Sequence, residues 1–227
     1  MSLRAIVFDF DGVIANSEPL HLRAFQEVLA DQRVGLSHDD YYSRYLGFDD
    51  AGVFRAIGGE RGIAWSDRDI ADLIARKASR IEILEQDTSV LFPGASDAIR
   101  RAAAILPIAI ASGALGHEIR RVLDREGLTS LFTAIVAAED TPASKPAPEP
   151  YLRAVAQLAA AMDQRLRPAE CIAVEDSVWG LESARAAGLR TVGVAQTYGR
   201  EALSAADLVI DQIVELSVPA LQLLCST

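Results

Sequence analysis

Short apolar runs alternate with amphipathic segments along most of the chain. The runs end in polar residues or turns, and they span residues 5–8, 108–111, 134–138, 171–174, 191–194 and 208–210. Short runs rich in β-branched residues are typical of strands that are buried on both faces of a parallel sheet. Most of the segments between them place apolar side chains at helical spacing. This alternation predicts an α/β fold whose core is a doubly wound, parallel, Rossmann-like sheet.

One long segment interrupts the alternation. Residues 34–87 carry helical, charged patterns broken by glycines and show no strand signal, and residues 69–77 are typical of an amphipathic helix. We therefore expect a small α-helical cap domain, residues 16–87, inserted into a core domain formed by residues 1–15 and 88–227. An insert joined by two linkers suits a lid over a site.

Composition narrows the possible partners and location. The chain has 227 residues, of which 50% are hydrophobic, and its formal net charge of −10 argues against nucleic acid as a partner. No basic and apolar leader and no stretch of membrane-spanning length are visible, so we expect neither export nor a membrane partner. The two cysteines, Cys171 and Cys225, lie far apart and suit a reducing cytoplasm. We expect a monomer.

Two carboxylates follow the first predicted strand. Asp9 and Asp11 lie where the apolar run ends, and in open α/β sheets ligands bind outside the carboxyl ends of the strands. Period-two alternation points both side chains to the same side, where two like charges raise one another's pKa unless a cation or a shared proton relieves them. A divalent metal is the simplest answer. The alternative is that Asp9 and Asp11 merely end the strand and begin a turn, as an Asp-Gly pair often does.

The second and third predicted strands are followed by groups suited to an anion. Ser112 and Gly113 offer a hydroxyl and backbone N–H groups that can hold phosphate oxygens, although a single Ser-Gly turn is more often structural. Prolines stiffen the loop around Lys145. Of the 22 basic residues only Lys77 and Lys145 are lysines. Genome composition explains most of the arginines, but a remaining lysine can mark a site that needs a compact charge.

A second acidic pair, Glu175 and Asp176, follows the fourth predicted strand. The carboxyl ends of parallel strands share one edge of the sheet, so this pair would meet Asp9 and Asp11 there. The repulsion among so many acidic groups requires a hard cation nearby. Mg²⁺ held by carboxylates and a backbone carbonyl would offset their negative charge. With one aspartate able to attack and another able to move a proton, the arrangement supports covalent phosphoryl transfer.

Four motifs in this order resemble those of the haloacid dehalogenase-like (HAD) superfamily of hydrolases, and the resemblance spans nearly the whole chain. They are Asp9-Phe10-Asp11-Gly12-Val13, Ser112, Ser144-Lys145-Pro146 and Val174-Glu175-Asp176-Ser177. The helical insert, with Ser17-Glu18-Pro19-Leu20-His21, is similar to that of the subgroup of β-phosphoglucomutase and its small-molecule phosphatase relatives.

The resemblance implies a role for each motif residue. Asp9 would be the nucleophile that becomes an aspartyl-phosphate, and Asp11 would protonate the leaving group and then activate water. The expected Mg²⁺ ligands are Asp9, the Asp11 backbone carbonyl, Glu175 and Asp176, and the expected phosphate ligands are Ser112, the Gly113 amide and Lys145. In the cap, the substrate-facing candidates are His21, Gly47, Asp50 and Lys77. A lone histidine on a helix is otherwise usually structural or solvated.

These expectations favour an Mg²⁺-dependent phosphatase acting on a small phosphorylated metabolite, a sugar or polyol phosphate. One alternative is a hexose-phosphate mutase similar to β-phosphoglucomutase. Where that group carries a phosphate-binding arginine, this chain has Asp50, and Ala114 and Gly116 replace polar residues of the mutase loop. An acidic side chain cannot hold a second phosphate. A further alternative is a non-catalytic binding protein of the same fold, against which the complete set of site residues argues.

Overall fold

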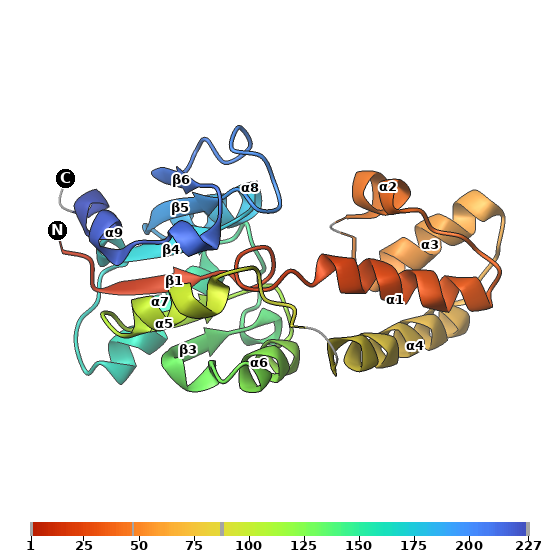
Figure 1. Cartoon of the computed structure of the whole chain (residues 1–227), viewed down its shortest axis with the longest axis horizontal. Coiled ribbons are helices and arrows are strands. Elements are labelled where there is room, and N and C mark those ends of the chain that lie inside the picture. The colour runs from red at the N-terminus through yellow and green to blue at the C-terminus, as the bar shows by residue number, and fades with distance from the viewer. Residues whose placement is uncertain (1, 47, 87–88, 226–227) are drawn as a thin grey trace. The chain divides into compact units, whose positions relative to one another are not determined.

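The computed structural model describes residues 2–46, 48–86 and 89–225 (Figure 1). Internal contacts divide the chain into two compact units. Residues 1–16 and 90–227 form the first, here called the core unit, and residues 17–89 form the second, here called the helical unit. No strand occurs in the described part of the helical unit.

The core unit contains a six-stranded parallel sheet in the order β3-β2-β1-β4-β5-β6. Its strands are β1 (Ala5–Phe8), β2 (Ile108–Ala111), β3 (Phe132–Val136), β4 (Cys171–Glu175), β5 (Arg190–Val194) and β6 (Leu208–Ile210). The predicted α/β fold class with a doubly wound parallel sheet is thereby confirmed.

Helices connect the strands and make up the helical unit. The core unit has α5 (Ala95–Ala103), α6 (Gly116–Arg125), α7 (Glu149–Ala161), α8 (Val178–Ala186), α9 (Val218–Leu224) and 3₁₀ turns at Thr129–Leu131, Ala138–Asp140, Pro168–Glu170 and Ile213–Glu215. The helical unit has α1 (Glu18–Asp31), α2 (His38–Asp40), a π-helical turn (Tyr41–Tyr45), α3 (Asp50–Arg61) and α4 (Asp67–Gln86). Among the described residues, no helix combines the length and the apolarity needed to cross a bilayer.

Strand β1 is buried on both faces, as its unbroken apolar sequence predicts. Val7 packs with Tyr151 in the cluster beneath α7 and α8, and Ile6 and Phe8 alternate to the opposite face; all four side chains are fully buried. Helix α7 contacts β1, β2 and β3, and α8 contacts β4 and β5. The packed layers therefore fix the carboxyl ends of the central strands.

The third strand lies two residues earlier than the sequence predicts, at Phe132–Val136 rather than 134–138. The exposed Thr133 interrupts its apolar pattern, which hides the strand's beginning. Phe132 belongs to the strand because it pairs with Ile108 and meets Phe8 edge-to-face at 6.4 Å between ring centroids. Ala137 then leads into a 3₁₀ turn.

The strand order places a topological switch point between β1 and β4. The chain builds the sheet outward from β1 through β2 and β3, then returns to add β4 on the other side. In such sheets the ligand crevice lies at this point. Phe8 pairs with Val174, and the Asp9 amide donates to the Val174 carbonyl at 2.9 Å. Asp9 and Glu175 therefore leave the sheet from adjacent strands.

The helical unit has its own aromatic core. Phe25 of α1 lies 5.2 Å from Phe54 of α3 and 5.8 Å from Tyr41, between ring centroids. Helices α1 and α4 pack against each other, and α3 packs against α4. This core gives the unit a hydrophobic centre separate from that of the sheet.

Candidate active site

Three buried carboxylates meet at the switch point of the core unit. Asp9, Glu175 and Asp176 each offer an oxygen atom, and these atoms all lie within 4.8 Å of one another. Asp9 and Glu175 come from neighbouring strands, and Asp176 follows Glu175 directly. The meeting of these side chains therefore follows from the register of β1 and β4.

The electrostatics of this cluster fit a hard divalent cation. Burial, with Lys145 opposing and Glu175 and Asp176 adding to it, raises the pKa of Asp9 well above its ordinary value. Burial, followed by the charge of Glu175, raises the pKa of Asp176 to about 7. Carboxylate oxygens are the ligands that Mg²⁺ prefers, and its charge would offset both the cost of burying these carboxylates and their mutual repulsion. The donor set thus suits Mg²⁺.

Asp11 lies on the loop that follows β1, close to the cluster. It forms an isolated bridge with Ala15, and its charge contributes to the raised pKa of Asp176. Gly12 has a left-handed backbone at φ +77°, and a Cβ there would stand 1.8 Å from Asp176 Oδ2. The loop can approach Asp176 this closely because residue 12 is glycine.

Lys145 joins two of the carboxylates. Its Nζ donates to Asp9 Oδ1 at 2.9 Å and to Glu175 Oε1 at 2.6 Å. Burial alone would lower the pKa of Lys145, but the carboxylates of Asp9 and Glu175 outweigh it and raise the pKa above its usual value. The lysine is therefore a fixed ammonium beside Asp9.

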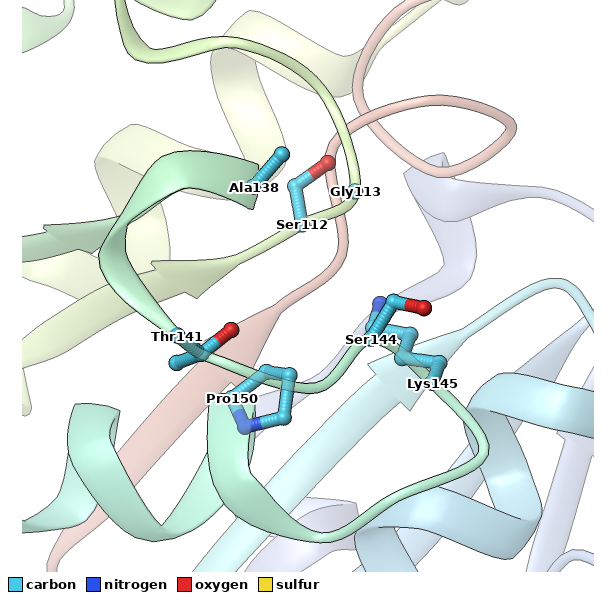
Figure 2. A pocket seen from close by; sticks show the side chains of 7 residues that line it. All are labelled: Ser112, Gly113, Ala138, Thr141, Ser144, Lys145 and Pro150. Atoms are coloured by element: carbon cyan, nitrogen blue, oxygen red, sulfur yellow. The ribbon is translucent and has the colours of Figure 1, made fainter. Parts of the chain in front are cut away.

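A cavity of about 140 Å³ adjoins Lys145 and is shown in Figure 2. Its lining includes the three predicted phosphate ligands, Ser112, Gly113 and Lys145, together with Ala138, Thr141, Ser144 and Pro150. Asp9 is not among the lining residues, and its link to the cavity is the ion pair with Lys145. A liquid water molecule takes up about 30 Å³. The cavity thus has room for a group several times larger than water.

Glu175 is held by donors on both of its oxygens. Besides Lys145, the Tyr151 hydroxyl donates to Oε1 at 2.6 Å, while Ser177 Oγ donates to Oε2 at 3.2 Å. Gly180 of α8 packs against this carboxylate, because a Cβ on Gly180 would lie 1.9 Å from Glu175 Oε2. The side chain is fully buried. Its orientation is therefore set by the surrounding protein.

The predicted cap residues form a separate cluster within the helical unit. Lys77 Nζ, which is almost fully buried, donates to His21 Nδ1 at 2.9 Å and to Asp50 Oδ1 at 2.5 Å and lies 4.4 Å from the centroid of the Phe25 ring. A lysine only donates, so Nδ1 of His21 accepts and the proton of the neutral ring is on Nε2. Gly47, the remaining cap candidate, lies outside the described residues.

A family model described as haloacid dehalogenase-like hydrolase matches residues 6–194, which include all four motifs. The chain belongs to the haloacid dehalogenase-like hydrolases. This confirms the family that the motifs indicate.

Named relatives are similar over most of their length. The protein CbbY of Rhodobacter capsulatus is 37% identical over 98% of this chain and 97% of its own. Hexitol phosphatase B of Escherichia coli K12 is 31% identical, over 84% of this chain and 82% of its own. A crystal structure of a CbbY variant from Rhodobacter sphaeroides with xylulose-(1,5)bisphosphate superposes with a TM-score of 0.76 at 26% identity and covers 95% of this chain and 96% of that one.

Two residues at this haloacid dehalogenase-like site, Tyr151 and Thr197, lie outside the four motifs. Tyr151 lies on the apolar face of α7 with Ala154 and Leu158, a pattern typical of core packing that gives no hint of its hydroxyl's partner. Thr197 hydrogen-bonds to Asp176 and lowers its pKa against the effect of burial. It lies just beyond β5, so extending the strand-end argument to the fifth strand would have found it.

Gly180→Ala should disable the site although alanine is the better helix former. The new methyl group would overlap the Glu175 carboxylate, so we expect kcat/KM to fall by at least about 100-fold. Gly59→Ala is the matched control, because Gly59 also lies in a helix and has open space around its Cβ position. It should raise the free energy of unfolding by about 0.5–1 kcal/mol and leave activity unchanged. Equal activity of the two variants in a steady-state assay would contradict the assigned geometry.

His21, on α1 of the helical unit, should make stability depend on pH. Burial and the charge of Lys77 lower the pKa of His21 from 6.5 to about 3. Below pH 6.5 the unfolded chain therefore binds a proton that the folded protein does not, and stability falls as the pH falls towards 3. From pH 6.5 to 5 we expect the free energy of unfolding of the wild type to drop by roughly 1–2 kcal/mol more than that of His21→Gln. Parallel curves in urea titrations would argue against a buried neutral His21.

Proposed function

We propose that the protein is an Mg²⁺-dependent phosphatase that hydrolyses a small phosphorylated metabolite, a sugar or polyol phosphate, through an aspartyl-phosphate on Asp9. One observation carries this proposal. Lys145 lines the cavity that Ser112 and Gly113 also line, and its ammonium pairs with Asp9 within the acidic cluster. In this proposal Lys145 links the phosphate site to the nucleophile Asp9. The similarity to a hexitol phosphatase supports the substrate class.

The proposed reaction uses two aspartates in turn. An Asp9 carboxylate oxygen attacks phosphorus, the ester P–O bond breaks, and Asp11 gives its proton to the departing alkoxide. Asp11 then takes a proton from a water molecule as this attacks the phosphorus. The bond to Asp9 breaks, and inorganic phosphate leaves. Ser112, the Gly113 amide and Lys145 stabilise the charge on the phosphoryl oxygens throughout.

Asp9, the Asp11 carbonyl, Glu175 and Asp176 are the proposed ligands of Mg²⁺. When bound, the ion would supply charge neutralisation for the attacking carboxylate and the phosphoryl oxygens. Residues 16–87 are proposed to act as a substrate-selecting cap domain. In this domain His21, Asp50 and Lys77 would contact the part of the substrate that does not react.

Phosphate release from a panel of sugar, polyol and nucleotide phosphates, with Mg²⁺ and with chelator, tests this function. We expect metal-dependent release that is fastest for sugar or polyol monophosphates. Isomerised sugar phosphate without release would instead identify a mutase. Binding of these compounds with neither reaction would favour the non-catalytic alternative.

Asp50 should select against a second phosphate. Its carboxylate neutralises Lys77, so Asp50→Asn leaves the ammonium without a carboxylate to offset its charge, which favours an anionic group. We expect the kcat/KM ratio of xylulose 1,5-bisphosphate to a hexitol phosphate to rise about tenfold, equivalent to about 1.4 kcal/mol. Asp49→Asn is the control, because Asp49 caps α3 through the Gly52 amide at 2.7 Å and asparagine caps equally well. The same ratio in all three proteins would remove Asp50 from the substrate site.

A further inference from the structure

One hydroxyl outside the four motifs reaches the centre of the site. Tyr151, in the first turn of α7, is fully buried, and its hydroxyl donates to Glu175 Oε1 at 2.6 Å. The same oxygen accepts from Lys145 Nζ, also at 2.6 Å. Lys145 Nζ lies 5.2 Å from the centroid of the Tyr151 ring. Tyr151 is thus in contact with both members of the ion pair.

The ring and the hydroxyl of Tyr151 have separable tasks. The ring packs among Ala154, Val155 and Leu158 beneath the sheet, a task that phenylalanine could perform equally well. The hydroxyl's partner is Glu175, so the polar atom is explained by the site and not by packing.

The Tyr151 hydroxyl restricts the orientation of the Glu175 carboxylate and so the position of the Lys145 ammonium. Because Glu175 has no solvent exposure, an oxygen that loses a donor finds no water in exchange. Its carboxylate would turn, or draw the ammonium closer, and Lys145 would leave its place 2.9 Å from Asp9 Oδ1. A displaced ammonium binds phosphate oxygens less well, because a charge-assisted hydrogen bond depends on the relative positions of both partners.

We propose that Tyr151 is a positioning residue that sets Lys145 for phosphate by fixing Glu175 Oε1. The proposal rests on the proposed function only in taking phosphate as the ligand of Lys145. It assigns to Tyr151 no contact with substrate.

Tyr151→Phe tests the proposal, and Tyr41→Phe is the matched control. Tyr41 is a buried tyrosine of the helical unit whose hydroxyl donates to Glu18 Oε2 at 2.7 Å, so it loses a comparable bond. The readouts are the Kd of inorganic phosphate in saturating Mg²⁺, by calorimetry, and kcat and KM for one phosphate ester. For Tyr151→Phe we expect phosphate Kd and KM to rise about 3–10-fold, with a smaller change in kcat. Tyr41→Phe should change none of the three, whatever it does to the melting temperature.

A double-variant cycle separates positioning from a general effect on the fold. If Tyr151 acts through Lys145, Tyr151→Phe should change phosphate binding little in a chain that already carries Lys145→Met. An equal loss in both backgrounds would overturn the proposal. So would unchanged phosphate binding in Tyr151→Phe, or a Tyr151→Phe chain that fails to fold while Tyr41→Phe folds, since the bond would then serve stability alone.

The experiment distinguishes a failure of the role proposed for Tyr151 from a failure of the proposed phosphatase function. Phosphate binding can be measured whether or not any ester is hydrolysed. Weaker phosphate binding in Tyr151→Phe with no turnover by the wild type would leave the positioning role standing and refute the phosphatase. Turnover by the wild type with identical constants in Tyr151→Phe would do the reverse.

Discussion

Replacing Asp9 by asparagine should lower kcat by at least about 1,000-fold and leave the protein folded. The amide is a poor nucleophile, so the phosphoryl group has no acceptor. The fold should tolerate the change because an amide oxygen can still accept from the Phe10 amide, which donates to Asp9 Oδ1 at 2.7 Å. Burial also disfavours a charged Asp9. We expect the metal-free free energy of unfolding to stay within about 1–2 kcal/mol of the wild type.

Steady-state kinetics and urea unfolding without metal check this result. Asp97→Asn is the control, because Asp97 is an exposed residue in the first turn of α5 and should affect neither quantity strongly. Ordinary turnover by Asp9→Asn would remove Asp9 from the role of nucleophile. Loss of the fold would show that its charge serves packing.

Lys145→Met should damage both activity and stability. The substitution removes the ammonium that lies against Asp9 and Glu175 and leaves two buried carboxylates without it. Breaking a buried ion pair on one side typically costs about 3–5 kcal/mol, and we expect a loss of that order in metal-free protein near neutral pH. We expect kcat/KM to fall by about 100–1,000-fold, because the phosphoryl group loses a fixed positive charge.

Arg153→Met supplies the comparison, since Arg153 is a half-exposed cation on α7, the helix that follows the Lys145 loop, and lies 4.0 Å from Asp140. An exposed pair of this kind contributes about 0–1 kcal/mol. Similar losses of stability and of kcat/KM in the two variants would contradict the view that Lys145 is a site residue. Chemical denaturation and initial rates at saturating Mg²⁺ give the two quantities.

The sequence predicts the fold class because buried strands have a simple sequence pattern. Strands covered on both faces must be apolar throughout, so β1 and β4 stand out, and the residues after them must meet if the strands are parallel neighbours. Asp9 and Glu175 could be placed together in this way. The edge strand β3 is less clear, since Thr133 points to solvent and breaks the run.

Contacts that depend on side-chain direction could not be predicted. Nothing in the spacing around Tyr151 shows that its hydroxyl reaches Glu175, because the same pattern suits a purely apolar helix face. The pairing of Asp50 with Lys77 joins residues 27 positions apart on α3 and α4, and only the packing of these helices brings them together. The loop at Gly12 could be predicted only in part. The glycine is visible in the sequence, but the closeness of the loop to Asp176 is not.

The most direct test of the account is to locate the phosphoryl group during turnover. The wild-type enzyme, mixed with a hydrolysed sugar or polyol phosphate and Mg²⁺, is quenched in acid, reduced with borohydride and digested for mass spectrometry. Borohydride converts an aspartyl-phosphate to homoserine, so we predict homoserine at position 9 and nowhere else. Homoserine at another position, or continuing hydrolysis with no modified residue at any time point, would contradict the central claim that Asp9 carries the phosphoryl group.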